Sequence, residues 1–135
     1  MAETFHLRIV SPSRIFYEGE AEFVEMKTVE GRIGIYAGHV PTTVILDPGM
    51  LVICGGGRTR KAALHTGFAQ ILPDRVSIMA EIAEWPEEID GSRAEEARIR
   101  ARRNLESGED ERSLRQAEMA LKKALARLET VDRLQ

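Results

Sequence analysis

The sequence predicts a mixed protein, in which an N-terminal antiparallel β-sandwich (residues 1–86) precedes a C-terminal antiparallel two-helix hairpin (residues 87–135). In the first part, short alternating or β-branched segments are separated by turns about every 8–12 residues, as in sandwiches and barrels. In the second part, apolar residues recur at helical spacing and no proline follows Pro86. Pro86 and Gly91 interrupt any regular element at the junction.

Nine segments of the first part have the alternation or β-branched content of strands. Asp47-Pro48-Gly49 predicts a turn, because proline presets φ and glycine accepts a positive φ. The glycines at 55–57 also predict a turn, since no Lys-Ser/Thr and helix follow them as in a phosphate-binding loop. The strands are expected at residues 5–9, 15–17, 21–28, 33–36, 42–46, 50–54, 60–64, 68–72 and 76–83.

Two helices are expected after the junction. Ser92 and Glu95 fit a capping box, with Asp90 as a competing N-cap. Gly108 ends this helix, and Ser113 opens a second possible capping box. A seam of spacing 3-4-3-4-3 then runs through Leu114, Ala117, Leu121, Ala124, Leu128 and Val131.

The seam of the hairpin is rich in alanine, which buries little apolar area. Two helices shorter than about 20 residues are marginal alone in water. The hairpin therefore needs the sandwich, a partner or a ligand to stay closed, and this weak packing suits a conformational switch.

Composition excludes several classes of protein. The net charge of −3 argues against general nucleic-acid binding. Cys54 is the only cysteine, so no internal disulfide can form, and no apolar stretch approaches the roughly 20 residues of a membrane span. No nucleophile, zinc or paired-carboxylate signature is present, and His6, His39 and His65 lack metal-ligand spacing. We therefore expect no catalytic residue and no metal site.

The charges are unevenly distributed along the chain. Residues 91–135 hold 11 basic and 9 acidic residues, whereas residues 1–90 hold 8 and 13. Arg93 and Arg100 share one helix face, and Lys123 and Arg127 share another. In an antiparallel hairpin these four cations could converge on the junction, where residues 84–90 hold four carboxylates, and bind a phosphorylated ligand. Ordinary surface charge is the alternative interpretation.

Over nearly its whole length the chain resembles the epsilon subunit of bacterial and chloroplast rotary F-type ATP synthases. The resemblance rests on residues 5–12, 30–41, 47–49, 65–68 and 117–128. Thr66 departs from it, because the family commonly has glycine there. The resemblance implies a non-catalytic central-stalk subunit that couples proton flow to ATP synthesis. Its sandwich is implied to bind the gamma subunit and the c-ring, the latter through a region containing Arg32, Gly38, His39 and Pro41.

The resemblance also implies that the hairpin moves. Docked on the sandwich it permits activity, and extended toward the alpha and beta subunits it inhibits ATP hydrolysis. The cations implied to contact an acidic loop of the beta subunit are Arg112, Arg115, Lys122 and Lys123. The protein is expected at the cytoplasmic face of the bacterial cell membrane, held there only through the complex.

Some bacterial members bind ATP in the docked state through an Ile/Leu-Asp-x-x-Arg-Ala motif, which residues 89–94 match. ATP would then be a regulatory ligand and no cofactor would be required; a need for Mg²⁺ is left open. Lysine at position 123, where such members often have arginine, keeps the charge but lacks the planar fork. The implied ATP-binding residues are Glu84, Ile89, Asp90, Arg93, Ala94, Arg100, Lys123 and Arg127.

Three alternatives stay open. A stand-alone nucleotide-sensing adaptor would not form a stoichiometric complex with a gamma-like partner. A stalk subunit with a purely structural tail would leave ATP hydrolysis unchanged when residues 91–135 are deleted. An independent small-molecule enzyme is disfavoured, because the sequence lacks a constellation of nucleophile, base or metal ligands.

Overall fold

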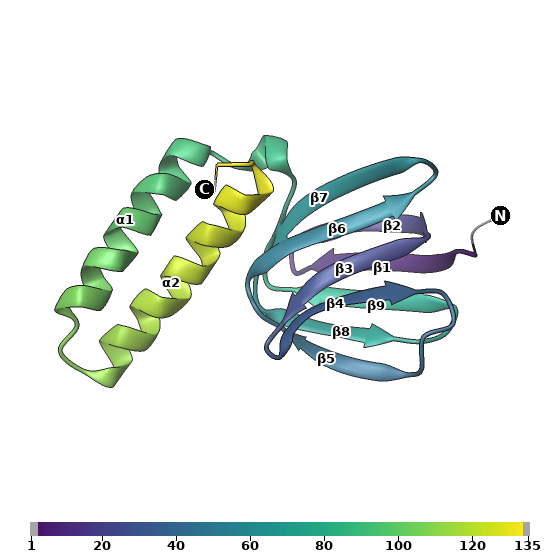
Figure 1. Ribbon diagram of the computed structural model, residues 1–135, viewed down its shortest axis with the longest axis horizontal. Helices are drawn as coiled ribbons and strands as arrows, with labels where there is room; N and C mark the ends of the chain where they lie inside the picture. The colour runs from purple at the N-terminus through teal and green to yellow at the C-terminus, as the bar shows by residue number, and fades with distance from the viewer. Residues whose placement is uncertain (1–2, 134–135) are drawn as a thin grey trace.

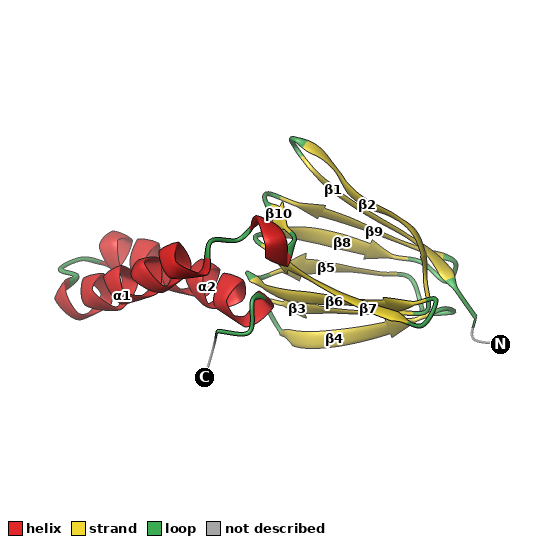
Figure 2. Ribbon diagram, turned by 90° about the horizontal axis from the view of Figure 1, so that it is seen from above, coloured by secondary structure: helices red, strands yellow, loops and turns green. Residues whose placement is uncertain are grey.

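A computed structural model describes residues 3–133 of the chain and confirms the expected fold class. The strands form a sandwich, and the two helices lie side by side at one end of it (Figure 1). Seen from above, the hairpin extends away from the strands (Figure 2). The strands are β1 (Phe5–Ser11), β2 (Arg14–Ala21), β3 (Phe23–Thr28), β4 (Gly31–Tyr36), β5 (Thr42–Leu46), β6 (Gly49–Gly55), β7 (Arg58–Leu64), β8 (Gly67–Ile71), β9 (Arg75–Ala80) and β10 (Ala83–Glu84).

The strands form one continuous sheet that folds over on itself. Its order is β10-β7-β6-β3-β5-β8-β9-β1-β2, and β4 pairs with the free side of β3. β3 meets β5 through the single pair Thr28 and Leu46, which makes the corner between the two layers. Every pairing is antiparallel except that of β1 with β9, which is parallel. Alternation along a strand indicates which side chains point inward, but not which strands become neighbours.

The sandwich encloses an apolar, largely aliphatic core. β1 shows the pattern: Phe5, Leu7 and Ile9 are buried, whereas His6 and Arg8 between them are exposed. The inward residues of the two layers meet in one cluster, as expected for half-buried strands. The expected glycine turn joins β6 to β7, with positive φ at Gly56 (59°) and Gly57 (74°). Two successive positive φ values match the twist of a tight hairpin.

The second part consists of a short 3₁₀ turn, η1 (Pro86–Glu88), and the helices α1 (Gly91–Ser107) and α2 (Glu111–Thr130). Asp90 caps α1, because its side chain accepts a hydrogen bond from the amide of Arg93. Asp110 caps α2 in the same way, through the amide of Ser113. Of the two N-caps considered for α1, the later one at Ser92 is therefore wrong, and so is the possible capping box at Ser113. Each aspartate satisfies one of the free amides in the first turn of its helix and adds a negative charge that the helix dipole favours.

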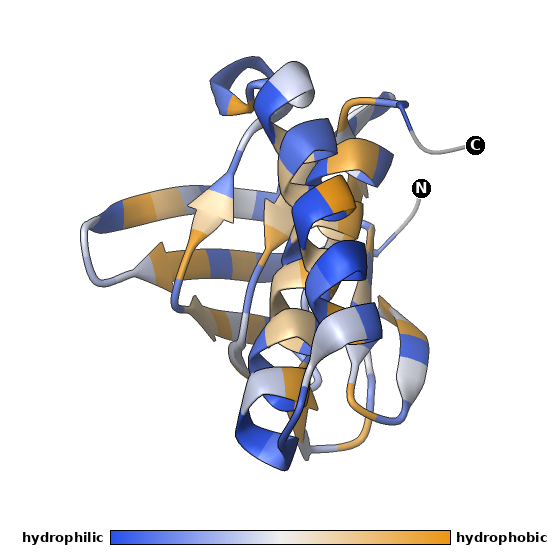
Figure 3. Cartoon of the chain, turned by 90° about the vertical axis from the view of Figure 1, so that its left-hand side faces the viewer, coloured by the Kyte–Doolittle hydropathy of each residue, from blue (hydrophilic) through white to orange (hydrophobic). Residues whose placement is uncertain are grey.

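α2 lies between α1 and the sandwich, where it packs on β6 and β7 (Figure 1). The expected seam is only partly buried: Ala117, Ala124 and Leu128 are inside, whereas Leu114 is 37% exposed. α1 contributes Ala94 and Ala101. The side of the hairpin that faces away from the strands is mostly hydrophilic (Figure 3). Within residues 3–133, no helix is both long and apolar enough to span a membrane.

Candidate functional site

The linker between sandwich and hairpin carries three of the eight residues expected to bind ATP, namely Glu84, Ile89 and Asp90. β10 pairs with β7 through Ala83 and Glu84, and η1 begins at Pro86. Proline suits the first helical position, because its missing N–H would have no partner there. Two residues after η1, Asp90 starts α1. Glu84, Glu88 and Asp90 are thereby placed within one short segment.

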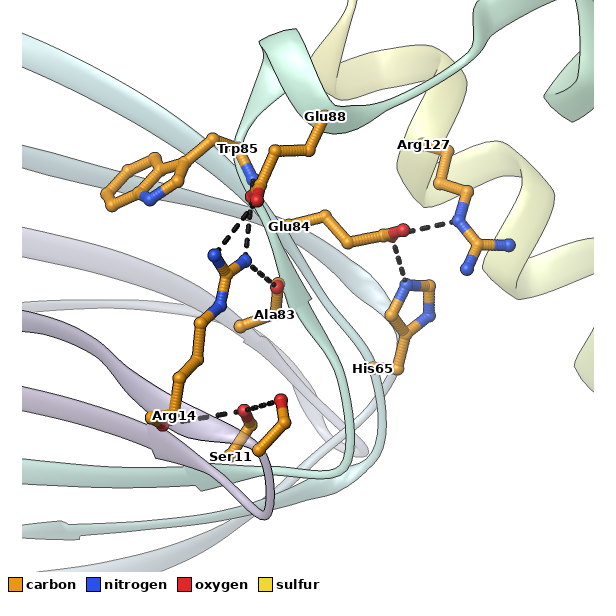
Figure 4. Close-up of polar contacts among 9 residues, drawn as sticks. Ser11, Arg14, His65, Ala83, Glu84, Trp85, Glu88 and Arg127 are labelled. Atoms are coloured by element: carbon orange, nitrogen blue, oxygen red, sulfur yellow. Dashed lines mark hydrogen bonds and ion pairs between the residues drawn. The ribbon is translucent and has the colours of Figure 1, made fainter.

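Glu84 connects the sandwich to α2. One of its carboxylate oxygens, Oε1, accepts hydrogen bonds from Nε2 of His65 (3.0 Å) and from Nε of Arg127 (2.8 Å) (Figure 4). His65 is fully buried, and its Nδ1 has no hydrogen-bond partner among the described residues. Burial raises the pKa of Glu84, but the hydrogen bonds from His65 and Arg127 lower it by more, so the pKa lies below its usual value.

Glu88 is held by Arg14 of β2. The guanidinium of Arg14 donates to both carboxylate oxygens, at 2.9 and 2.7 Å, and to the carbonyl of Ala83 at 3.0 Å (Figure 4). The hydrogen bond from Arg14, and next the one from the Trp85 amide, lower the pKa of Glu88. The bond to Glu88 raises the pKa of Arg14. A bidentate pair of this kind fixes orientation as well as charge.

A pocket of about 440 Å³ lies between the linker and the two helices. Three guanidinium groups and three carboxylates line it, so it offers hydrogen-bond donors to an anion and acceptors to donor groups of a ligand. Its lining residues are Glu84, Glu88, Ile89, Asp90, Arg93, Ala94, Ala97, Arg100 and Arg127.

The pocket contains seven of the eight residues expected to bind ATP. Arg93 and Arg100 are exposed and have no ion-pair partner among residues 3–133, which leaves their charge available to a ligand. Arg127 already pairs with Glu84. Lys123 is half-buried one turn earlier on α2 and does not line the pocket.

The four residues expected at the c-ring do not form one cluster. Arg32, near the start of β4, pairs with Glu25 (3.3 Å) and donates to the carbonyl of Met50. Gly38 follows the other end of β4, where its amide donates to Pro73. His39 and Pro41 continue that loop, so Arg32 is separated from the other three by the length of the strand.

The cations expected to contact the beta subunit are spread along α2. Arg112 and Arg115 are exposed in its first turns, and Arg115 pairs with Glu111 (3.5 Å). Lys122 instead reaches the sandwich, where it pairs with Asp47 of the β5–β6 turn at 3.2 Å. Lys123 is half-buried. Lys122 therefore helps to hold α2 against the sandwich.

Sequence reasoning missed Arg14 and His65, which hold the linker carboxylates, and Asp47, which pairs with Lys122 of α2. The Arg14–Glu88 contact spans 74 residues of chain, and the Asp47–Lys122 contact spans 75. No local spacing signals such contacts. Within the described part of the chain, no group of three or more His, Cys, Asp or Glu side chains is arranged to hold a metal ion.

The lowered pKa of Glu84 predicts that stability falls in acid. As pH falls, the Glu84 carboxyl takes up a proton in the unfolded state, where its pKa is near 4.3, before it does so in the folded state. The stability that Glu84 contributes is therefore fully present above pH 4.3 and is lost as pH falls through the folded pKa. Chemical unfolding measured between pH 6 and pH 3 should therefore show that the free energy of unfolding falls less steeply with pH in Glu84→Gln than in the wild type. Glu87→Gln, at an exposed linker position, should keep the wild-type slope. Equal slopes in all three proteins would contradict this role of Glu84.

Comparison with known proteins identifies both parts of the chain. Residues 4–86 match the family described as ATP synthase, Delta/Epsilon chain, beta-sandwich domain. Residues 87–132 match ATP synthase, Delta/Epsilon chain, long alpha-helix domain.

Relatives named ATP synthase epsilon chain align over nearly the full length. The one from Caldanaerobacter subterraneus is 41% identical, covering 100% of this chain and 99% of its own. The one from Clostridium novyi is 42% identical, covering 97% and 100%.

Solved structures agree with these relatives. A chain of the Euglena gracilis mitochondrial ATP synthase (OSCP/F1/c-ring) has a TM-score of 0.82 at 29% identity, covering 93% of this chain and 79% of that one. A chain of the Tetrahymena thermophila enzyme (central stalk/c-ring) shares the fold at a TM-score of 0.71 and 13% identity, covering 96% and 97%. The chain therefore belongs to the ATP synthase delta/epsilon chain family.

Proposed function

We propose that this protein is a non-catalytic rotor subunit of the ATP synthase central stalk, coupling proton translocation to ATP synthesis. We further propose that its hairpin inhibits ATP hydrolysis when extended and is held in the docked position by ATP. The single observation that carries the regulatory part is the junction pocket, because its walls come from the linker, α1 and α2 together. Such a pocket exists only while the hairpin is docked.

The outer face of the sandwich offers a surface for the gamma subunit. Five apolar residues from five neighbouring strands lie in register across it, each paired with the next. Four of them are 43–56% exposed and Val10 is half-buried. Contiguous exposed apolar surface of this kind is typical of partner interfaces. This apolar row consists of Ile45, Phe68, Met79, Val10 and Ile15.

The similarity to chains of ATP synthase structures that include the c-ring supports both stalk partners. Within the complex, the loop of Gly38, His39 and Pro41, or the more distant Arg32, would face the ring. The protein would then reach the membrane only through its partners. The exposed Arg112 and Arg115 would be presented to the beta subunit when the hairpin extends. Lys122 would join them once it leaves Asp47, together with the neighbouring Lys123.

The energetics of docking suit a ligand-controlled switch. Apart from Leu128, the buried side chains of α2 are alanines and a threonine, and its ion pairs to Asp47 and Glu84 are partly exposed. Partly exposed ion pairs contribute little, and alanines bury little area. A ligand that binds only the docked state stabilises it by about 2.7 kcal/mol at 100 times its Kd, which is enough to reverse a marginal equilibrium.

Calorimetric titration of the isolated full chain with ATP tests the ligand. The wild type should bind saturably, and Arg93→Ala should weaken binding about tenfold or more, because a hydrogen bond to a charged group is worth roughly 1.5–3 kcal/mol. Arg102→Ala removes an exposed arginine of α1 that does not line the pocket, and should bind as the wild type does. Absence of binding at millimolar ATP would leave a stalk subunit whose tail acts through its partners alone.

A further inference from the structure

Arg14 fastens the linker to the far layer of the sandwich. It comes from β2, yet its guanidinium contacts Glu88 with both arms and the carbonyl of Ala83 with one, and it lies 5.0 Å from the ring centre of Phe16. Glu88 also accepts a hydrogen bond from the amide of Trp85 at 2.8 Å. η1 has no buried residue of its own, so these contacts hold it in place.

The neighbouring linker residues are also tied to the sandwich. Trp85 stacks on Phe16 with ring centres 4.0 Å apart, and the guanidinium of Arg60 lies 3.8 Å above its ring. Glu84 is bonded to His65. Residues 84–88 are therefore held fixed against the sandwich, although they follow its last long strand.

The attachment changes character after Glu88. The amide of Ile89 bonds to Pro86 inside the turn, and Asp90 caps α1. α1 then makes its main contacts with α2, and reaches the sandwich through it. Among the described residues, Ile89 and Asp90 are the first after Glu88 whose backbone hydrogen bonds stay within the turn and α1, so the hairpin can turn there without breaking a hydrogen bond to the strands. Both residues line the junction pocket.

We propose that Arg14 is a positioning residue for the junction pocket: by pinning Glu88 it makes residues 84–88 a fixed wall and confines the pivot of the hairpin to Ile89 and Asp90. The part of this inference that concerns ligand affinity rests on the nucleotide site proposed above. The part that concerns the linker does not need a ligand.

Arg14 would favour an anionic ligand in two ways. It holds residues 84–88 in the conformation that binds the ligand, so less conformational entropy is lost on binding. It also occupies the carboxylate of Glu88, which lines the same pocket as Arg93, Arg100 and Arg127. A released Glu88 is free to turn toward these guanidinium groups and compete with a phosphate. Lysine cannot replace Arg14 fully, because it lacks the planar fork that engages both oxygens.

The test compares Arg14→Gln, Arg14→Lys, Glu88→Gln and the double variant Arg14→Gln/Glu88→Gln in the isolated full chain. Arg8→Gln is the matched control, since Arg8 is exposed on the adjacent β1 and its nearest ion-pair partner, Glu18, is 4.0 Å away. Two quantities are measured: the Kd for ATP by calorimetry, and the hydrogen exchange of the amides of Trp85, Glu88 and Ile89 without ligand.

Arg14→Gln should weaken ATP binding about three- to fivefold, the effect of a half-exposed ion pair. It should also speed exchange at the three amides while leaving the core strands protected. Arg14→Lys should recover only part of both losses. The double variant should bind ATP more tightly than Arg14→Gln, because the competing carboxylate is gone; a residue that only stabilised the fold would not show this recovery. Arg8→Gln should behave as the wild type does.

The two proposals fail in different ways. If the wild type does not bind ATP, the nucleotide site is lost and exchange alone decides the role of Arg14. If the amides of Trp85, Glu88 and Ile89 exchange as slowly in Arg14→Gln as in the wild type, the proposal that Arg14 fixes the linker is overturned, whether or not ATP binds. Where the wild type binds ATP, an unchanged Kd in Arg14→Gln, or no recovery in the double variant, overturns the positioning role.

Discussion

Gly67→Ala should prevent the sandwich from forming its native sheet. Gly67 starts β8, a strand held between β5 and β9, and it pairs with Leu46 on one side and Ala80 on the other. A β-carbon at this position would lie 1.9 Å from the carbonyl oxygen of Met79 and 2.8 Å from the Cα of Ala80. Both are backbone atoms of a central strand, so no side-chain rotation can relieve the clash.

The loss in the free energy of unfolding should be among the largest that a single added methyl group can cause in this chain. Relief requires the β8–β9 pairing to open, and a loss above about 4 kcal/mol is a large part of the stability of a domain. The damage would also reach the junction, because His65, which holds Glu84, lies two residues before Gly67. We expect a low yield of soluble protein and, in chemical unfolding, a midpoint far below that of the wild type.

Gly19→Ala provides the matched control. A β-carbon there would meet only the end of the Tyr17 side chain, at 3.3 Å, and Tyr17 can move. β2 is also the last strand of the sheet order, so a small shift disturbs one neighbour only. Its unfolding midpoint should stay close to that of the wild type. A Gly67→Ala protein as stable as Gly19→Ala would mean that the β8–β9 register is not the one described above.

Leu128→Ala should release the hairpin while the sandwich stays folded. Leu128 is fully buried, and the other buried positions of α2 are the alanines 117, 124 and 126 and Thr130. Truncating a buried leucine typically costs 2–5 kcal/mol, which exceeds what small residues and partly exposed ion pairs can replace. The loss should therefore appear as undocking of α1 and α2, and it is limited to the free energy of docking.

Limited proteolysis and hydrogen exchange together check this outcome. Residues 91–130 should become sensitive to protease and exchange fast, whereas the strands keep their protection. Leu114→Ala makes the same chemical change on the same helix at a side chain that is 37% exposed, and should leave docking intact. A hairpin that stays protected in Leu128→Ala would show that docking depends on contacts other than this side chain.

The strands were predictable because their information is local. The alternation in residues 5–9 and the glycine turn at 55–57 each describe a few neighbouring positions, and both predictions are confirmed. The parallel pairing of β1 with β9 depends on how distant segments pack, which alternation does not encode. Thr66 shows the same limit. Its hydroxyl simply donates to Glu81 at 2.8 Å, whereas the position that demands glycine is the next one.

The candidate site was predictable to a smaller extent. Helical spacing and the resemblance named seven of the nine residues that line the pocket, but not Glu88 or Ala97. Lys123 was also expected there but lies outside the lining. The partners that hold the carboxylates, Arg14 and His65, come from strands far away in the sequence. Their roles follow from the strand order, which the sequence alone left open.

The apolar row across β2, β1, β9, β8 and β5 has a consequence for how cells must produce this protein. A newly made copy without its partner presents Ile15, Met79, Phe68 and Ile45 to solvent on one broad face. Such a face promotes self-association and precipitation. Free copies should therefore associate with one another at high concentration, so that synthesis in balance with the proposed partner, as well as the stability of the fold, limits how much soluble chain accumulates.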